Sequence, residues 1–356
     1  ILDNLHVPFW ATTIIILIMI VLYTFEGGVK TIVYTDTLQT TLMLAGLVIC
    51  IVYILSNLQL GVGEAFSMMQ AKGYTQIFNF DLSSNGYYLK QIIGGAFIAI
   101  AMTGLDQEMM QKNISVEKLK DAQKNVITFS TVIVLVNFLF LFLGGLLYIF
   151  MLSKQGAYVD HEFIANGKNI IGDDLFPTVA LNYFPQAIGI IFIIALISAL
   201  FPSADGALTA LTSSFCIDML GLQRNENWDE KKRKQIRLLV HASFTIIFFL
   251  CILIFKWIGN KSIIYIILDV AGYTYGPLLG LFAFGILTKR FVKDNLLITA
   301  ICILSPIISW LIKTYSADLF NGYQVGIELL IINGLLTFIG LFLISKKNDS
   351  NFKTKD

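Results

Sequence analysis

The most informative stretch of the chain is ALISALFPSADGALTALTSSFCIDML, residues 195–220. It is apolar enough to cross a membrane, yet it carries Asp205 in its middle. An acid at the centre of a bilayer costs about 2.5–3.5 kcal/mol on insertion scales, so it normally has a partner or a function. We therefore consider two interpretations: Asp205 belongs to a cation site, or it hydrogen-bonds a neighbouring helix or lies near the membrane surface.

Two faces can be distinguished on this predicted helix. Small residues recur every four positions and allow a neighbouring helix to approach closely; they are Ala195, Ala199, Ser203 and Ala207. A second stripe is polar, and it contains Ser198, Asp205, Thr209 and Thr212. On an unbroken helix Ser203 and Asp205 point about 200° apart. Pro202 removes a backbone donor, so we expect either an irregular backbone at 201–204 or two separate sites.

Composition defines the class of protein. The chain has 356 residues, of which 56% are hydrophobic and only 14% charged, against about 25% charged in soluble domains. Apolar runs of spanning length predict a polytopic membrane protein whose partner is the lipid bilayer and which has no nucleic-acid surface. The expected spans are 7–25, 37–56, 91–110, 126–152, 186–220, 238–258, 262–288, 295–314 and 325–345.

Basic residues predict the orientation of these spans. With the connection at 26–36 placed in the cytoplasm, most of the 25 Lys and Arg residues fall on the cytoplasmic side, as the positive-inside rule requires. We expect a multi-pass protein of the plasma (inner) membrane with a cytoplasmic C-terminus. The chain starts with Ile1 and not with Met, and we expect it to begin inside a longer protein.

The remaining signals are glycines, prolines and carboxylates within or at the ends of spans. We find no motif of an enzyme and assign no catalytic residue. Gly27 and Gly28 are expected to end one helix, and Asp36 either caps the next helix or lies on a cation path. Gly276 and Pro277 predict a kink, which serves helix packing or a site. Interrupted helices of this kind form the ion and substrate sites of transporters.

Four stretches together carry a resemblance to a known family. In chain order they are EGGVKTIVYTDTLQ (26–39), DQEMMQK (106–112), SADGALT (203–209) and GPLLGLF (276–282). The chain resembles the sodium:solute symporter family, which contains the sodium/glucose and sodium/proline cotransporters. The resemblance covers about residues 10–290 and is specific because the motifs follow the family order.

The resemblance implies an all-α, inverted-repeat helical bundle of the leucine-transporter type. Residues 1–290 would then form a partial core with seven spans, core helices four to ten. Residues 291–345 would form two accessory helices, and 346–356 a cytoplasmic tail. The first three core helices would lie before Ile1.

The resemblance also implies site residues. Sodium ligands fall on the backbone carbonyl of Ala199 and on Ser203, and a second cation position falls on Asp205 with Asp36. Pro202 stands where members commonly have a hydroxyl. Candidates for the substrate path are Met102, Thr103, Asp106, Gln107, Tyr273 and Tyr275. The acids at 106–108 have a simpler interpretation as interfacial residues.

These residues imply sodium-coupled symport of a small solute by alternating access, with Na+ as the coupling ion. The alternatives are a proton-coupled transporter, in which Asp205 carries the proton, and a transporter-like sensor. The third span lacks polar side chains from Ile92 to Ala101. Because a polyol needs such hydrogen-bonding partners, we do not expect glucose or galactose as the solute.

The predicted orientation can be tested by labelling. A single cysteine introduced in the 225–235 loop should react with a membrane-impermeant maleimide only after the cytoplasmic side has been opened, because this basic loop is expected inside. Reaction in intact cells would invert the topology.

Overall fold

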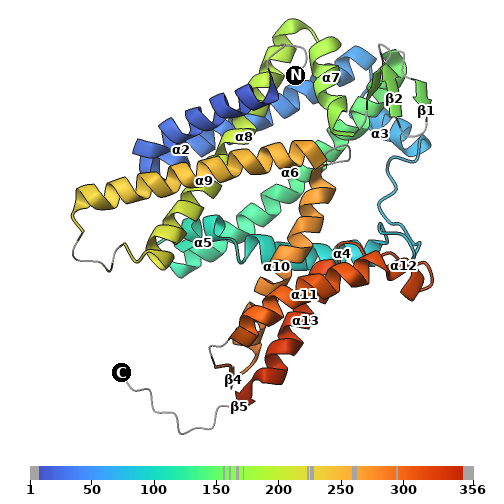
Figure 1. The fold of residues 1–356 in the computed structure, drawn as a ribbon. Helices are drawn as coiled ribbons and strands as arrows, with labels where there is room; N and C mark the ends of the chain where they lie inside the picture. The colour runs from blue at the N-terminus through green and yellow to red at the C-terminus, as the bar shows by residue number, and fades with distance from the viewer. Residues whose placement is uncertain are drawn as a thin grey trace. The chain divides into compact units, whose positions relative to one another are not determined.

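The computed structural model describes residues 8–114, 116–154, 157–159, 162–165, 168–170, 172–222, 224, 228–258, 263–293 and 296–347. It divides into two units (Figure 1). The first comprises Ile1–Thr75 and Gln111–Asn260, and the second Gln76–Met110 and Lys261–Asp356. Each unit is described by itself.

The larger helices of the first unit are α2 (Phe9–Leu58), α6 (Leu119–Lys154), α8 (Gln186–Ser214) and α9 (Glu230–Ile258). Shorter elements are α3 (Val62–Ala71), α7 (Leu175–Asn182), a 3-10 turn (Gly172–Asp174) and a π-helical end of α8 (Phe215–Met219). The second unit contains α4 (Tyr88–Ile98), its π-helical extension (Ala99–Thr103), α10 (Ile263–Leu287), α11 (Leu296–Thr314), α12 (Ser316–Leu319) and α13 (Leu329–Ile344). Helix α5 (Gln107–Ile114) runs across the boundary between the units.

Helix length and composition agree with the predicted spans. Within the described residues, 6 helices are long and apolar enough to cross a membrane. Shorter apolar helices lie at Phe9–Leu22, Tyr88–Thr103 and Leu329–Ile344, where the sequence predicted the first, third and ninth spans.

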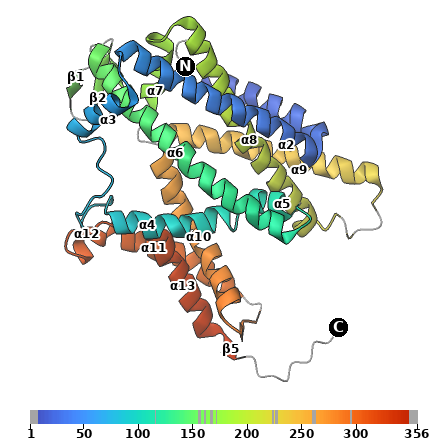
Figure 2. The same ribbon diagram turned by 180° about the vertical axis from the view of Figure 1, so that it is seen from behind.

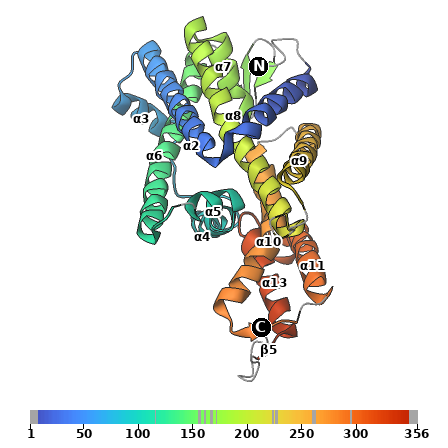
Figure 3. The ribbon, with the colours of Figure 1, turned by 90° about the vertical axis from the view of Figure 1, so that its left-hand side faces the viewer.

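One backbone prediction was wrong, and one of two backbone alternatives is excluded. Helix α2 continues from Phe9 to Leu58 without ending at Gly27 and Gly28, so Asp36 lies inside a helix and is not an N-cap. Figure 3 shows that α2 is nevertheless bent. Helix α8 is continuous through Pro202, so of the two alternatives for this helix the irregular backbone at 201–204 is not present.

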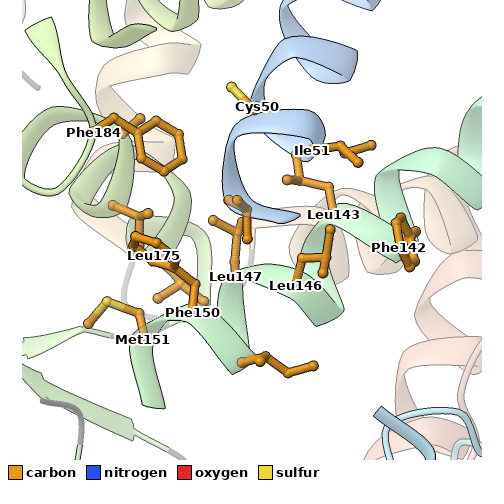
Figure 4. Packing of buried hydrophobic residues seen from close by; sticks show 14 of the residues in the cluster. Cys50, Ile51, Phe142, Leu143, Leu146, Leu147, Phe150, Met151, Leu175 and Phe184 are labelled. Carbon is orange, nitrogen blue, oxygen red and sulfur yellow. The ribbon is translucent and has the colours of Figure 1, made fainter. Parts of the chain in front are cut away.

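The main apolar core of the first unit lies between the second half of α2, α6, α7 and the start of α8 (Figure 4). Ile54, Leu146 and Phe150 are fully buried there. Tyr53 packs edge-on against Phe184 with ring centroids 4.8 Å apart. Further along, Gly46 lies directly against Ala195. The second half of α2 therefore runs antiparallel to α8.

The first half of α2 contacts a different part of α8. Leu17 and Ile20 pack with Leu208, and Phe244 and Phe248 of α9 close this small cluster. Both halves of α2 thus use α8 as their common partner.

The loop at 153–185 contains structure that the sequence did not predict. Three short strands, β1 (Ala157–Val159), β2 (Glu162–Ala165) and β3 (Lys168–Ile170), form an antiparallel meander. Ile170 places its side chain in the apolar core of the first unit. The strands are too short to give a recognisable alternating pattern.

In the second unit α10, α11 and α13 lie side by side (Figure 2). Helices α10 and α13 are parallel, because Gly272 lies against Leu329 and Gly280 against Thr337. Helix α11 is antiparallel to α13, since Ser305 bonds Thr337 and Ile301 contacts Gly340. Strands β4 (Arg290–Phe291) and β5 (Lys346–Lys347) pair where α10 and α13 end.

A buried lysine holds the start of α4. The ammonium of Lys90 donates to the carbonyl of Gln324 at 3.2 Å and lies 3.5 Å from the ring centroid of Tyr323. Tyr323 donates to Glu328 at 2.9 Å, and burial together with this bond raises the pKa of the phenol to about 12. The cluster fastens α4 to the segment that precedes α13.

The contact between Gly46 and Ala195 yields a stability prediction. A Cβ at Gly46 would collide with Ala195, whereas a Cβ at Gly144 of α6 would meet nothing within 4 Å. Replacing glycine by alanine inside a helix otherwise gains about 0.5–1 kcal/mol. Gly144→Ala should therefore keep or raise the thermal unfolding midpoint of the purified protein, and Gly46→Ala should lower it. Equal midpoints for the two variants would contradict the packing.

Candidate functional site

Helix α8 presents its polar residues on two different faces. Asp205 is fully buried, and Ser198 and Thr212 are buried with it. Ser203 is exposed and Ala199 is half-buried. Because the helix is unbroken, Ser203 and Asp205 point about 200° apart. One ion therefore has no access to both side chains, and a single site that Ser203 and Asp205 share is excluded.

Pro202 changes the hydrogen bonding of α8 without breaking it. Having no N–H, it leaves the carbonyl of Ser198, four residues earlier, without its usual helical donor. Ser198 lies seven residues, about two helical turns, before Asp205 and on the same side of the helix. The middle of α8 therefore combines a carboxylate with a backbone acceptor, which are the oxygen ligands that hard cations prefer.

Asp36 reaches the same level as Asp205. Asp36 precedes Gly46 by ten residues and Asp205 follows Ala195 by ten, about 15 Å in each case at the helical rise. The helices α2 and α8 are antiparallel here, and Gly46 contacts Ala195. Asp36 and Asp205 therefore lie at the same height along the helix axes, on the same side of the Gly46–Ala195 contact. Each buries its Oδ1 atom. Within the described residues there is no group of three His, Cys, Asp or Glu side chains able to hold a metal ion.

A histidine bridge joins three helices of the same unit. His241 of α9 is buried; its Nδ1 lies 3.0 Å from Thr212 Oγ1 of α8, and its Nε2 lies 3.2 Å from Thr24 Oγ1 of α2. Thr212 Oγ1 also lies 2.7 Å from the carbonyl oxygen of Leu208, and Thr24 Oγ1 lies 2.8 Å from that of Ile20. Each hydroxyl can either donate to the ring or accept from it, and the tautomer of His241 decides which.

Sequence reasoning missed this bridge. The polar stripe on α8 identified Thr212, but nothing in the sequence connects it to a single histidine 29 residues later. His241 sits at one position of an otherwise ordinary helix, where a histidine alone predicts no partner.

The candidates for the substrate path all belong to the second unit. The π-helical turn Ala99–Thr103 ends α4, and π-helical turns occur frequently at functional sites. Its Ala101 is fully buried against Leu279 and Leu330, with Tyr275 packed beside them. Met102 is half-buried and Thr103 exposed. The structure thus brings the π-helical turn and Tyr275 together.

Asp106 and Gln107 have a structural role at the start of α5. The backbone N–H of Met109 donates to Asp106 Oδ1 at 3.0 Å, which is the geometry of a helix N-cap. Gln107 is the first residue of α5 and is exposed. The interfacial interpretation of this segment therefore accounts for the position of Asp106.

Tyr273 lies on α10 near an ion pair and a buried amide. Asp269 pairs with Lys313 of α11 at 2.6 Å, so the charge of this acid is neutralised by a neighbouring helix. The backbone carbonyl of Tyr273 accepts a hydrogen bond from Asn333 of α13 at 2.8 Å. Asn333 was not among the residues that the sequence singled out.

Apolar helices of spanning length, with a carboxylate buried in the middle of one of them, are typical of membrane transport proteins. A sequence model described as the sodium:solute symporter family matches residues 2–302. The chain belongs to the sodium:solute symporter family, as the four motifs predicted.

Relatives and a solved structure agree with this assignment. The chain is 23% identical to the sodium/sialic acid symporter NanT of Aliivibrio fischeri, over 90% of this chain and 62% of that protein. It is 24% identical to the sodium/sialic acid symporter SiaT of Proteus mirabilis, over 91% and 64%. It is 21% identical to the human sodium/myo-inositol cotransporter 2, over 81% and 45%. The chain spans less than two thirds of these relatives.

The fold comparison points in the same direction. The structure resembles that of a Na+-coupled sialic acid symporter in a substrate-bound, outward-open state, described as having a Na+ site. The TM-score is 0.73 at 18% identity, over 96% of this chain and 69% of that one. The predicted leucine-transporter-type helical fold is confirmed.

Proposed function

We propose that the chain forms the greater part of a sodium-coupled symporter that carries a small solute across the plasma membrane by alternating access. The family assignment and the sodium-coupled relatives support this. The single observation that carries the proposal is the full burial of Asp205 in the middle of an unbroken membrane helix. A buried acid there is costly unless it has a function or a partner.

The proposed cation site lies between α8 and the second half of α2. Asp205 is its main ligand and Asp36 lies at its level, with the carbonyl of Ser198 as a further oxygen. Ala199 and Ser203 belong to the opposite face and would contribute to a separate sodium site. Met102, Thr103, Tyr273 and Tyr275 are the proposed contacts of the solute path, with Asp106 and Gln107 at its edge. The partners are sodium, a small solute and the bilayer; we expect no nucleic acid.

The orientation and the helix assignments are part of the proposal. We infer that the spans up to about residue 290 are core helices four to ten, that 291–345 are accessory, and that the tail at 346–356 lies in the cytoplasm. Because two relatives are named as sialic acid symporters, we propose an acidic sugar of this class as the first solute to test. Its carboxylate, which glucose and galactose lack, offers a group for recognition that does not depend on hydroxyl partners in the third span.

Charge removal tests the cation site. Asp205→Asn keeps the size of the side chain but loses its charge, so the sodium concentration for half-maximal uptake should rise by on the order of tenfold, which corresponds to about 1.4 kcal/mol. Asp218→Asn is the matched control, because Asp218 lies at the exposed end of the same helix and accepts a hydrogen bond from Ser214. An unchanged sodium curve in a well-expressed Asp205→Asn variant would refute the site. Dependence of uptake on pH in place of sodium would favour the proton-coupled alternative.

Solute uptake tests the activity itself. Proteoliposomes containing the full-length protein should accumulate radiolabelled sialic acid when sodium is higher outside, and should not accumulate glucose or galactose. The collapse of accumulation when potassium replaces sodium is the required control. Sodium-driven glucose uptake well above empty liposomes would overturn the solute assignment.

A further inference from the structure

Pro277 deprives a backbone carbonyl of α10 of its helical donor, and a side chain of α13 supplies a donor in its place. Because Pro277 has no N–H, the carbonyl of Tyr273, four residues earlier, loses its helical donor. The side-chain amide of Asn333 donates to this carbonyl at 2.8 Å and to that of Gly272 at 3.0 Å. Asn333 is fully buried. Within a bilayer a carbonyl without a hydrogen-bond donor is strongly unfavourable. The Asn333 amide provides the donor that Pro277 removes.

Three glycines of α10 make room for this contact. Gly276 lies directly against Asn333, and a side chain at 276 would collide with it. One turn to either side, a Cβ at Gly272 would come within 3.6 Å of Leu329 Cβ, and a Cβ at Gly280 within 2.6 Å of Thr337 Cβ. The two parallel helices thus stay in register and in close contact over two turns, with Asn333 at the centre.

Thr337, which faces Gly280 of α10, also joins α13 to α11. Thr337 lies 2.7 Å from Ser305 and donates to the backbone carbonyl of Asn333 at 3.1 Å. One turn further, Ser309 Oγ and Asn333 Oδ1 are both buried and have no hydrogen-bond partner among the described residues. Because α11 and α13 are antiparallel, Ser309 and Asn333 face each other one helical turn away from the Ser305–Thr337 contact. A hydroxyl donor and an amide acceptor are chemically matched there.

We propose that Asn333 is a positioning residue for transport. It joins α10 to α13 at the Pro277 interruption, so that the two helices move as one body and the segment 273–275 keeps one orientation. The link to transport rests on the proposed function, in which this segment contacts the solute path. The joining of the two helices does not depend on it. Helix α13 would then be a functional part of the transporter and not only a membrane anchor.

A double-mutant cycle tests the link between Asn333 and Pro277. Asn333→Leu removes the amide with little change in size and should lower the thermal unfolding midpoint markedly, because the Tyr273 carbonyl loses its donor. Pro277→Ala restores a backbone N–H for that carbonyl. Asn333→Leu should therefore lower the thermal unfolding midpoint less in the Pro277→Ala background than in the unmutated protein. Additive shifts would overturn the proposal, and Ser309→Ala, which leaves the α10 contact intact, is the control with a smaller expected effect.

Distance measurements test the single body without any solute. Spin labels at Ile286 of α10 and Leu343 of α13 continue the observed register and are 76% and 78% exposed in the native residues. In the full-length protein their distance distribution should be narrow and identical in sodium and in potassium, and should broaden in Asn333→Leu. A sodium-dependent distance, or an unchanged distribution in Asn333→Leu, would refute the proposal. Failure of sialic acid uptake in the unmutated protein would count against the proposed function alone.

Discussion

The lack of water in the membrane is the constraint on which the rest of this structure depends. Every backbone carbonyl in the hydrocarbon region needs a partner from the protein, and Pro202 and Pro277 each remove one helical donor. In α10 the resulting demand is met by Asn333 from another helix. The two prolines therefore do not act as breaks. They mark the places where a backbone carbonyl needs a hydrogen-bond donor from a neighbouring helix or binds another ligand.

Close approach between helices follows from the same constraint. Lipid tails are as apolar as leucine, so helices gain little by burying large apolar side chains and associate through tight packing and interhelical hydrogen bonds. Gly46 against Ala195 and Gly276 against Asn333 show both forms of contact. In the second case the glycine and the amide are inseparable, because the hydrogen bonds require a backbone approach that a larger residue at 276 would prevent.

The sequence predicted the apolar spans and the two faces of α8 because both depend on periodicity within one helix. It failed where a neighbour decides the outcome. Gly27 and Gly28 were expected to end a helix, but glycine costs a helix only about 1 kcal/mol each, and α2 continues. His241 and Asn333 carry no local signal of their partners, which lie 29 and 60 residues away at Thr212 and Tyr273. An isolated amide in the apolar sequence LLIINGLL was the one available hint.

The geometry of α8 also bears on how membrane voltage acts on the proposed cycle. An ion held by Ala199 and Ser203 would meet only neutral oxygens, so it would carry its full charge across the field, worth about 2.3 kcal/mol per 100 mV. An ion held by Asp205 would be paired with a carboxylate, and if that carboxylate moves with the ion, no net charge is displaced in the loaded step; the charge moves when the empty carboxylate returns. Because the unbroken helix keeps Ser203 and Asp205 on different faces, the two contributions would belong to different ions. Voltage would then act on the loaded step for an ion on the Ser203 face and on the return of the empty carboxylate for an ion at Asp205, while each transported ion contributes its full charge over the whole cycle.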